Sequence, residues 1–355
     1  MTTNVKRLAY FEKWVDPVAE EILGQRHDIE LVRRRYADPD GDNHQVMARV
    51  HGYQIAPRTE LHEPWFGDAD LLRRCPELLA ISSTGAGFDM VDVAACTAHG
   101  VLVCNQSGSN KEAVAEHALG LMLALAKNIG ITDRALRRER DLDRFLYTGR
   151  ELRGRTVGIV GIGQIGTRTA ELCRGLLGMT VLAHDPYLSA DEVAARGATK
   201  VPLDELLARS DFVSVHCPRN DETFGMFGAA QFAAMRPTAY FVNTARGGIH
   251  DEAALEAALA AGRIAGAGVD VFLKEPPDPD HPLLRLPNVI ATPHIAGITE
   301  EALATMAEAA AYQWIQIFEG RVPPRLVNPE AWPHYAARFE RILGFAPDPL
   351  PARPA

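Results

Sequence analysis

The sequence predicts an α/β protein built from two doubly wound parallel-sheet domains of the Rossmann or flavodoxin type. From residue 156 onward, short apolar stretches without polar alternation are separated by amphipathic stretches and short connections. Apolar strands that alternate with helices are typical of a parallel sheet covered on both faces. The chain also opens with a strand, a helix and a strand, at residues 5–10, 15–23 and 29–32. Its 355 residues leave room for two such cores.

The first part of the chain predicts a smaller domain. A turn at residues 38–41 (DPDG) follows the opening strands, and the pattern of elements weakens over residues 41–70. A buried strand is expected at residues 78–82, directly before the segment STGAGFD at 83–89.

Two helices are expected next. Ser109 and Glu112 are spaced as a capping box, and apolar residues fill most positions from 113 to 126, which indicates a helix buried between domains. A charged helix around residues 132–144 should present mostly a solvated face.

The remainder predicts a larger domain. Its expected strands are at 156–160, 179–184, 212–216, 239–243, 267–271 and 289–292, and its expected helices are at 164–177, 203–208, 229–235, 252–261 and 299–318. The last of these helices and the tail lie beyond the alternating unit. The simplest arrangement is therefore a nucleotide-binding domain at 109–296, inserted into a substrate domain made of 1–108 and 297–355.

The composition argues against several functional classes. A net charge of −9 disfavours nonspecific binding to nucleic acid or anionic lipid. The five cysteines are scattered and include no CxxC pair, so they predict reduced thiols rather than a disulfide framework or a metal site. The first ten residues lack the apolar core of a signal peptide, and the apolar run at 118–126 is too short to span a bilayer. We expect a cytoplasmic protein without metal, membrane or nucleic-acid partner.

A nucleotide site is indicated by a glycine motif in the larger domain. Gly161, Gly163 and Gly166 form GxGxxG between an expected strand and an expected helix, and Asp185 ends the next strand, 19 residues beyond Gly166. The glycines permit a tight turn, close approach of a pyrophosphate and close helix packing, and the helix N-terminus offers free N–H donors. The carboxylate can accept from both ribose hydroxyls and would repel a 2′-phosphate. The motif therefore predicts NAD rather than NADP.

Three side chains further along are candidates for chemistry, because each follows a strand end, where open parallel sheets bind ligands. They are Arg246, Glu275 and His294. A guanidinium group suits a substrate carboxylate and polarises a nearby carbonyl. Histidine serves as acid or base for the alkoxide, and a nearby glutamate would orient the imidazole. Together they predict hydride transfer between NAD(H) and a small 2-hydroxy or 2-keto acid.

Eight ordered motifs resemble those of the D-isomer-specific 2-hydroxyacid dehydrogenase family. They are STGAGFD at 83–89, VAEH at 114–117, GIVGIGQIG at 158–166, HCP at 216–218, NTARG at 243–247, GVDV at 268–271, EP at 275–276 and TPHIAG at 292–297. The set covers roughly residues 78–320 and is far more specific than any one motif.

The resemblance implies the roles of the matching residues. Arg246 would bind the substrate carboxylate, His294 would be the acid/base, and Glu275 its partner. Asp270 would hold the nicotinamide carboxamide. The smaller domain would cradle the carboxylate with backbone N–H groups of the loop Thr84, Gly85, Ala86 and Gly87.

The resemblance also implies a set of cofactor contacts. They are Gly161, Gly163, Gln164, Ile165, Gly166, Asp185, His216, Cys217, Pro218, Thr244, Ala245, Asp270, His294 and Gly297. Cys217 and Pro218 would line the adenosine side, although a small buried apolar side chain is nearly as good an interpretation of Cys217. Members of the family commonly have a cleft that closes on substrate and form homodimers through the nucleotide domains. We expect a homodimer here too, with residues 132–144 near the interface.

Two segments depart from the family pattern. The segment 41–70 is longer and more aromatic than the short strand usual in the family. Its aromatic and histidine side chains either shape the substrate pocket or form a small core of their own in a surface loop. These side chains are His51, Tyr53, Trp65 and Phe66. The chain also continues past Pro329, where an apolar helix face is expected from Trp332, Tyr335, Phe339 and Leu343.

Two alternatives to a general 2-hydroxy acid dehydrogenase stay open. Within the family, the substrate can be specifically phosphoglycerate, hydroxypyruvate or glyoxylate. From a different class, some relatives are NAD-sensing corepressors that bind peptides and retain all three catalytic residues. Turnover with 2-keto acids separates the two classes, because a pure sensor binds NADH without reducing them.

Overall fold

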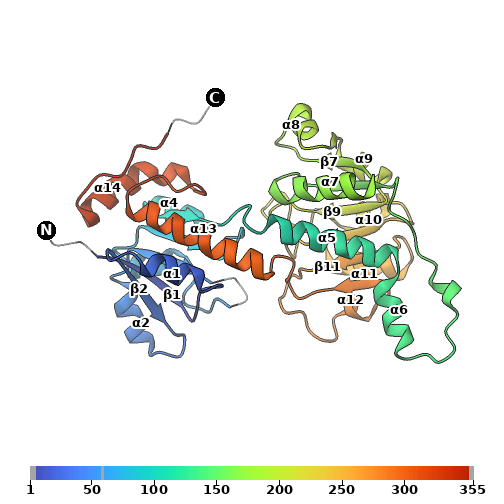
Figure 1. The fold of residues 1–355 in the computed structure, drawn as a ribbon, viewed down its shortest axis with the longest axis horizontal. Helices are drawn as coiled ribbons and strands as arrows, with labels where there is room; N and C mark the ends of the chain where they lie inside the picture. Colours follow the sequence, from blue (N-terminus) through green and yellow to red (C-terminus); the bar gives the residue numbers. More distant parts are fainter. Residues whose placement is uncertain (1–4, 57–59, 352–355) are drawn as a thin grey trace. The chain divides into compact units, whose positions relative to one another are not determined.

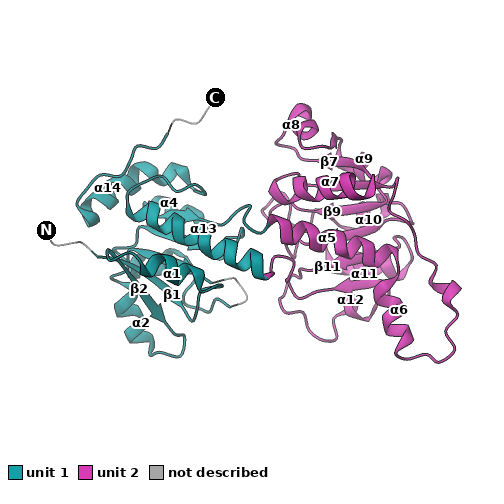
Figure 2. Ribbon diagram, in the orientation of Figure 1, with its two compact units in different colours: residues 1–110, 300–355 teal, residues 111–299 magenta. Residues whose placement is uncertain are grey.

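The computed structural model describes residues 5–56 and 60–351 of the chain. The chain divides into two compact units, unit 1 with residues 1–110 and 300–355, and unit 2 with residues 111–299 (Figure 2). Each unit is built on a parallel sheet with helices around it (Figure 1). This confirms the predicted α/β fold class.

Unit 1 contains a five-stranded sheet in the order β2-β1-β3-β4-β5. Its strands are β1 (Lys6–Phe11), β2 (Ile29–Arg34), β3 (Gly52–Ile55), β4 (Ala80–Ser83) and β5 (Leu102–Cys104). Its helices are α1 (Val18–Gly24), α2 (Asp40–Met47), α3 (Ala69–Arg74), α4 (Val93–Ala98), α13 (Glu300–Phe318) and α14 (Trp332–Leu343). All its strand pairs are parallel.

The segment with the weakest sequence pattern contributes the middle strand of this sheet. β3 is only four residues long, and all four are buried. Tyr53 and Trp65 belong to an apolar core together with Phe11, on one face of the sheet. Phe11 and Trp65 rings lie 4.8 Å apart. Of the two interpretations of residues 41–70, the structure therefore supports a core for these two aromatic side chains.

The C-terminal part of the chain completes the other face of the sheet. The buried residues of α14 are Trp332, Tyr335, Phe339 and Leu343, which confirms the predicted apolar helix face. They pack in one core with Leu8 of β1 and with Trp314 of α13.

Unit 2 contains a seven-stranded sheet in the order β12-β11-β10-β9-β6-β7-β8. Its strands are β6 (Thr156–Val160), β7 (Thr180–His184), β8 (Thr199–Lys200), β9 (Phe212–Val215), β10 (Tyr240–Asn243), β11 (Gly266–Val269) and β12 (Val289–Ala291). Its helices are α5 (Lys111–Ala126), α6 (Ile129–Leu136), α7 (Gln164–Leu177), α8 (Ala190–Ala195), α9 (Leu203–Arg209), α10 (Ala229–Ala234), α11 (Glu252–Ala260) and α12 (Pro282–Arg285), with a 3₁₀ turn η1 (Arg144–Tyr147).

Both faces of the unit 2 sheet are buried. In β10, Tyr240 and Val242 belong to one apolar core, whereas Phe241 belongs to the other. Successive side chains of a strand point to opposite faces, so helices cover this sheet on each side. Because both faces are buried, the strands of unit 2 show no alternation of apolar and polar residues.

Two local expectations were wrong. Glu112 does not close a capping box, because its carboxylate pairs with Arg168 at 2.7 Å, and the Ser109 hydroxyl has no hydrogen-bond partner among the described residues. The charged helix expected at 132–144 begins at Ile129 and ends at Leu136. Asp143 then accepts from the N–H of Phe145 and starts η1 instead.

No single helix of the described ranges is long and apolar enough to cross a membrane. Only α5 and α6 taken together reach that length, and they are bent by 59° where they join.

Candidate active site

The predicted site residues of unit 2 gather at one edge of its sheet. The glycine motif follows β6, Asp185 follows β7, Arg246 lies in the loop after β10, and His294 lies in the loop after β12. These strands are parallel members of one sheet, so the loops at their carboxyl ends lie along the same edge. Open parallel sheets bind their ligands there.

The glycine loop between β6 and α7 has the shape that a pyrophosphate needs. Gly161 has a φ of 85°, and a Cβ atom there would lie 2.7 Å from the backbone nitrogen of Cys217. A Cβ atom at Gly166 would collide with the carbonyl oxygen of Gly161, so both positions require glycine. At Gly163 a Cβ atom would meet nothing within 4 Å. This leaves open space beside the first turn of α7, where free N–H groups and the helix dipole favour an anion.

Two buried polar atoms beside this loop have no hydrogen-bond partner among the described residues. They are Nδ1 of His216, after β9, and Oγ1 of Thr244, after β10. Burial lowers the pKa of His216 to about 4, so this ring is neutral. Buried polar atoms are normally satisfied, and a bound nucleotide would supply partners. The residues of this edge therefore fit NAD.

Asp185 is held at the end of β7 by two backbone N–H groups. Its Oδ2 accepts from Ile162 at 3.2 Å and its Oδ1 from Tyr187 at 3.1 Å. The remaining lone pairs are available to a ribose. Sequence reasoning missed Arg196, whose Nη1 donates to the carbonyl of Ile162 at 2.6 Å. This cation reaches the glycine loop from 34 residues away, and no motif announces it.

The other predicted cofactor residues of unit 2 lie on the same loops. Gln164 and Ile165 begin α7, the Pro218 carbonyl accepts from Thr223 Oγ1 at 2.7 Å, and Gly297 follows the His294 loop. Cys217 is half-buried and packs against a unit 2 core; burial raises the pKa of its thiol to about 11.

His294 and Glu275 form a hydrogen-bonded pair. The imidazole Nδ1 lies 2.8 Å from Oε2 of Glu275, and the His294 side chain is 35% exposed. Burial alone would raise the pKa of Glu275, but it is lowered overall by the hydrogen bond and charge of His294, by the N–H of Phe272 and by the charge of Arg246. Glu275 is therefore ionised, and it accepts a hydrogen bond from the Nδ1–H group of His294. The ring's Nε2 remains available to a substrate.

Arg246 lies on a loop that contacts the Glu275 loop. Its Nη1 donates to the carbonyl of Ala245 at 2.7 Å, and Asn243 fixes its backbone by donating to the Arg246 carbonyl at 3.0 Å. A Cβ atom at Gly247 would collide with the carbonyl of Phe272, so the two loops touch backbone to backbone. The structure thus brings Arg246, Glu275 and His294 together.

The carboxylate of Asp270 accepts three hydrogen bonds. It is fully buried. Its Oδ1 accepts from the Thr292 hydroxyl and from the N–H of Ile295, and its Oδ2 accepts from the N–H of Ala296. Its contact with a nicotinamide stays a prediction, whereas its contact with the His294 loop is direct.

In unit 1, the loop Thr84–Gly87 follows β4 and is fixed through its carbonyls. Asn105 donates to the Ala86 carbonyl at 2.8 Å, the Gln106 N–H donates to the Gly85 carbonyl at 2.8 Å, and the Ser83 hydroxyl donates to the Gly87 carbonyl. Within residues 5–56 and 60–351, no acceptor takes the N–H groups of Gly85, Ala86 or Gly87. Three adjacent free N–H groups can bind an anion.

His250 supports the Arg246 loop and provides a pH-dependent prediction. It is buried, and its Nδ1 accepts from the side chain of Asn243 at 2.9 Å. Burial lowers the pKa of His250 to about 4, an effect opposed by Glu252 and Asp251 and reinforced by His281. The folded value lies below the unfolded value of about 6.5, so the unfolded chain takes up the proton first. Stability is therefore lost as the pH falls from about 6.5 to about 4.

We expect His250→Asn to reduce this acid sensitivity. Asparagine keeps an acceptor for Asn243 but does not titrate. Between pH 7 and pH 4.5 the wild type should lose about 2 kcal/mol more of unfolding free energy than the variant, measured by urea denaturation. His27→Asn, at an exposed position, is the control. Equal losses in wild type and His250→Asn would show that this histidine does not couple folding to pH.

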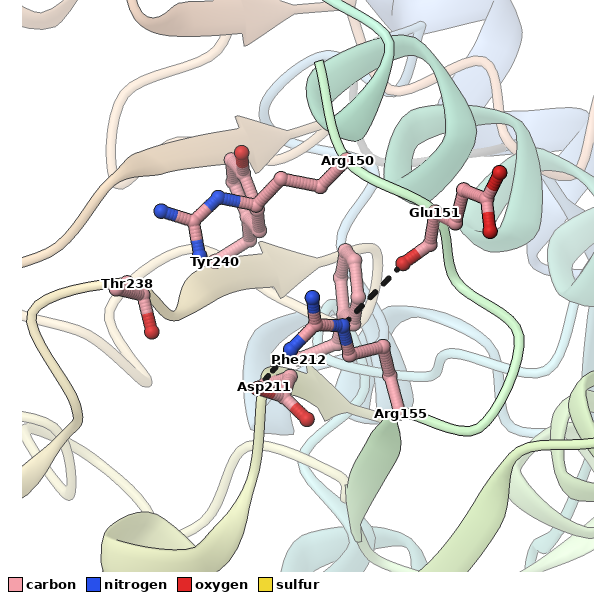
Figure 3. Close-up of a pocket in the computed structure, with 7 residues that line it drawn as sticks. All are labelled: Arg150, Glu151, Arg155, Asp211, Phe212, Thr238 and Tyr240. Carbon is pink, nitrogen blue, oxygen red and sulfur yellow. Dashed lines mark hydrogen bonds and ion pairs between the residues drawn. The ribbon is translucent and has the colours of Figure 1, made fainter.

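One cavity of unit 2 lies away from this edge. It is a small, partly open pocket, and it is lined by Arg150, Glu151, Arg155, Asp211, Phe212, Thr238 and Tyr240 (Figure 3). Phe212 and Tyr240 begin β9 and β10, so the cavity is at the amino ends of these strands. Substrates of parallel sheets bind at the opposite ends, and we assign it no part in the chemistry.

Comparison with known proteins agrees with this geometry. Residues 119–296 match the NAD-binding domain of D-isomer specific 2-hydroxyacid dehydrogenases. The chain is 42% identical to a D-3-phosphoglycerate dehydrogenase of Archaeoglobus fulgidus over 74% of its own length and 49% of that protein, so it spans about half of that relative. It is 36% identical to a glyoxylate reductase of Aeropyrum pernix over 89% of this chain and 94% of that protein.

Solved structures show the same architecture. The holo form of D-mandelate dehydrogenase from Rhodotorula graminis superposes with a TM-score of 0.80 at 27% identity, covering 91% of this chain and 97% of that one. The NAD-binding match covers residues 119–296, where the glycine loop, Asp185 and the three candidate catalytic side chains lie. The chain therefore belongs to the D-isomer specific 2-hydroxyacid dehydrogenase family.

Proposed function

We propose that this protein transfers a hydride between NAD(H) and a small D-2-hydroxy acid or its 2-keto acid. The observation that carries the proposal is the Glu275–His294 pair, joined at 2.8 Å, beside Arg246 at the ligand-binding edge of an NAD domain. When bound, NADH supplies the hydride for reduction. Unit 2 is then the NAD-binding domain, and unit 1 the substrate domain.

The side chains divide the remaining work. Arg246 grips the substrate carboxylate with its guanidinium fork and polarises the carbonyl. His294 gives the Nε2 proton to the substrate oxygen on reduction and takes it back on oxidation. Glu275 accepts from Nδ1, fixes the ring and stabilises the imidazolium. The free N–H groups of the Gly85–Gly87 loop in unit 1 are proposed to bind a carboxylate.

The substrate is proposed to be a small 2-keto acid such as glyoxylate or hydroxypyruvate. A relative named glyoxylate reductase aligns along nearly its whole length, 94%, whereas the phosphoglycerate dehydrogenase relative is matched over only 49%. In the two arginine clusters of unit 1, at residues 33–35 and 73–74, Arg34 is ion-paired with Asp38 and Arg73 with Asp70.

A panel assay tests the function. NADH oxidation is followed with glyoxylate, hydroxypyruvate, pyruvate, 2-ketoglutarate and bulkier aryl 2-keto acids. A preferred substrate among the small acids supports the proposal. NADH binding without turnover on any of them would contradict it and favour a sensor.

Asp185 provides a prediction for cofactor choice. We expect Asp185→Ala to weaken NADH binding at least about tenfold, because the ribose hydroxyls lose their hydrogen bonds to a charged acceptor. NADPH should change much less, because the repulsion of its 2′-phosphate disappears at the same time. Fluorescence titration of both cofactors measures this. Asp191→Ala, on the exposed face of α8, is the matched control, and equal weakening of NADH and NADPH would show that another group reads the ribose.

We also propose a homodimer formed through unit 2. The segment from α6 to η1 projects from the rest of this unit (Figure 1) and carries Leu136, Phe145 and Leu146, which are 72%, 72% and 80% exposed. Exposed apolar side chains on one projecting segment are typical of an interaction surface, and a second copy would cover them. Sedimentation should give twice the monomer mass, and Leu146→Asp should lower it; a monomeric wild type would refute the dimer.

A cytoplasmic location is proposed as well, without membrane or nucleic-acid partners. All five cysteines are free thiols, as in reducing compartments, and the net charge of −9 repels polyanions. Recovery of the protein in the membrane fraction of lysed cells would contradict this.

A further inference from the structure

The backbone of His294 is held in an unusual conformation. Its φ is 56°, in the left-handed region that residues other than glycine seldom adopt. Such a conformation persists only where the surrounding structure imposes it. Something must therefore hold this loop.

Asp270 receives three successive N–H groups of the loop. The N–H of His294 donates to the Asp270 carbonyl at 2.7 Å, that of Ile295 to Oδ1 at 2.9 Å and that of Ala296 to Oδ2 at 2.9 Å. Because the carboxylate is fully buried, no water competes for these bonds. The position of Asp270 therefore sets the path of the loop that presents the imidazole.

The carboxylate is in turn held by two residues outside the loop. The Thr292 hydroxyl lies 2.5 Å from Oδ1 of Asp270, and Nε2 of His117 lies 3.1 Å from the Thr292 oxygen. Thr292 has one hydroxyl proton, and at this distance the hydroxyl donates it in a hydrogen bond to the carboxylate. The His117 Nε2 must then donate, which gives the direction His117 to Thr292 to Asp270.

His117, the first donor in this series of hydrogen bonds, lies on the 16-residue helix α5. His117 belongs to α5, which packs against α7 and against β10 and β11, and it reaches Thr292 across 175 residues of sequence. It is half-buried, and its Nε2 is 3.8 Å from the Asp270 carboxylate. A helix fixed on both sides is a firm support for a hydrogen-bond donor.

We propose that His117 and Thr292 are positioning residues, which orient the Asp270 carboxylate and thereby fix the backbone of His294. Neither touches the reacting atoms. The effect on turnover rests on the proposed function, whereas the effect on the loop does not.

The test compares matched variants of the full chain. Thr292→Val removes the hydroxyl at constant shape, and Thr292→Ser restores it. His117→Leu removes the donor, and His117→Gln restores one. Thr169→Val is the control, because among the described residues this buried hydroxyl donates to the Ile165 carbonyl of its own helix and to no other group.

The first readout is amide hydrogen exchange of the peptide that contains Ile295 and Ala296, which needs no substrate. We expect exchange to become about tenfold faster in Thr292→Val and His117→Leu, the effect of one lost hydrogen bond to a charged group, and to stay slow in Thr292→Ser, His117→Gln and Thr169→Val. Unchanged exchange in Thr292→Val would overturn the proposal even if the enzyme is active. Faster exchange would uphold it even if no 2-keto acid is turned over.

The second readout is the division between kcat and KM. Thr292→Val should lower kcat about tenfold with KM for NADH within about twofold, and the double variant with His117→Leu should be no slower than Thr292→Val alone, since both break one chain of hydrogen bonds. If the losses of kcat in the two single variants multiply in the double variant, His117 and Thr292 do not act through one series of hydrogen bonds. Equal losses of kcat in Thr292→Val and Thr292→Ser would contradict the proposal as well.

Discussion

Replacing His294 with asparagine should lower kcat by about 10² to 10⁴-fold, the usual contribution of a general acid or base. Asparagine is the informative substitution, because it tolerates the left-handed backbone that His294 adopts at φ 56°. The three N–H bonds to Asp270 can then survive while the transferable proton is lost. Steady-state kinetics with the best 2-keto acid measures the effect.

NADH binding provides the control for this variant. The glycine loop and Asp185 lie on other strands and should be undisturbed, so the NADH Kd should stay within about threefold, which is under 1 kcal/mol. A His294→Asn enzyme that keeps more than a tenth of wild-type kcat would mean that another group, or water, supplies the proton.

Replacing Arg246 with alanine should lower kcat/KM for the 2-keto acid by about 10² to 10⁴-fold. Two hydrogen bonds to a charged carboxylate are lost, each worth about 1.5–3 kcal/mol, and each 1.36 kcal/mol corresponds to about tenfold in rate. Arg246→Lys should recover part of the loss, because an ammonium group keeps the charge but not the fork.

The same measurement of NADH binding separates substrate recognition from damage to the fold. The backbone of Arg246 is held by Asn243 through its carbonyl, so truncation of the side chain leaves the loop its support. NADH binding that survives in Arg246→Ala assigns the residue to the substrate. Joint loss of NADH binding and turnover would refute that separate role.

Local sequence signals were sufficient for the larger part of the fold. The strands of unit 2 are continuous apolar segments because both faces of the sheet are buried, and the glycine motif lies between β6 and α7 as its spacing requires. Arg246, Glu275 and His294 could be selected because each follows a strand, and the carboxyl ends of parallel strands share one edge.

What the sequence did not reveal depends on contacts between distant residues. β3 is only four residues long, and its burial comes from its place between β1 and β4 in the sheet. Arg196, at the C-terminal end of α8, donates to the Ile162 carbonyl, and His117 lies near Thr292 although 175 residues separate them in sequence. The capping box failed for a similar reason, since Arg168 is a stronger partner for Glu112 than a backbone N–H.

The handedness of the product tests the central claim most directly. The enzyme is incubated with NADH and the best 2-keto acid of the panel whose reduction creates a stereocentre, and the 2-hydroxy acid is resolved on a chiral column. We expect a single isomer, because Arg246 and His294 fix the carboxylate and the oxygen and so leave one face of the carbonyl to the nicotinamide, and we expect the D isomer because the matching family is D-isomer specific. A product of L configuration, or a racemic one, would contradict the assignment of these residues, and absence of any product would contradict the proposed reaction itself.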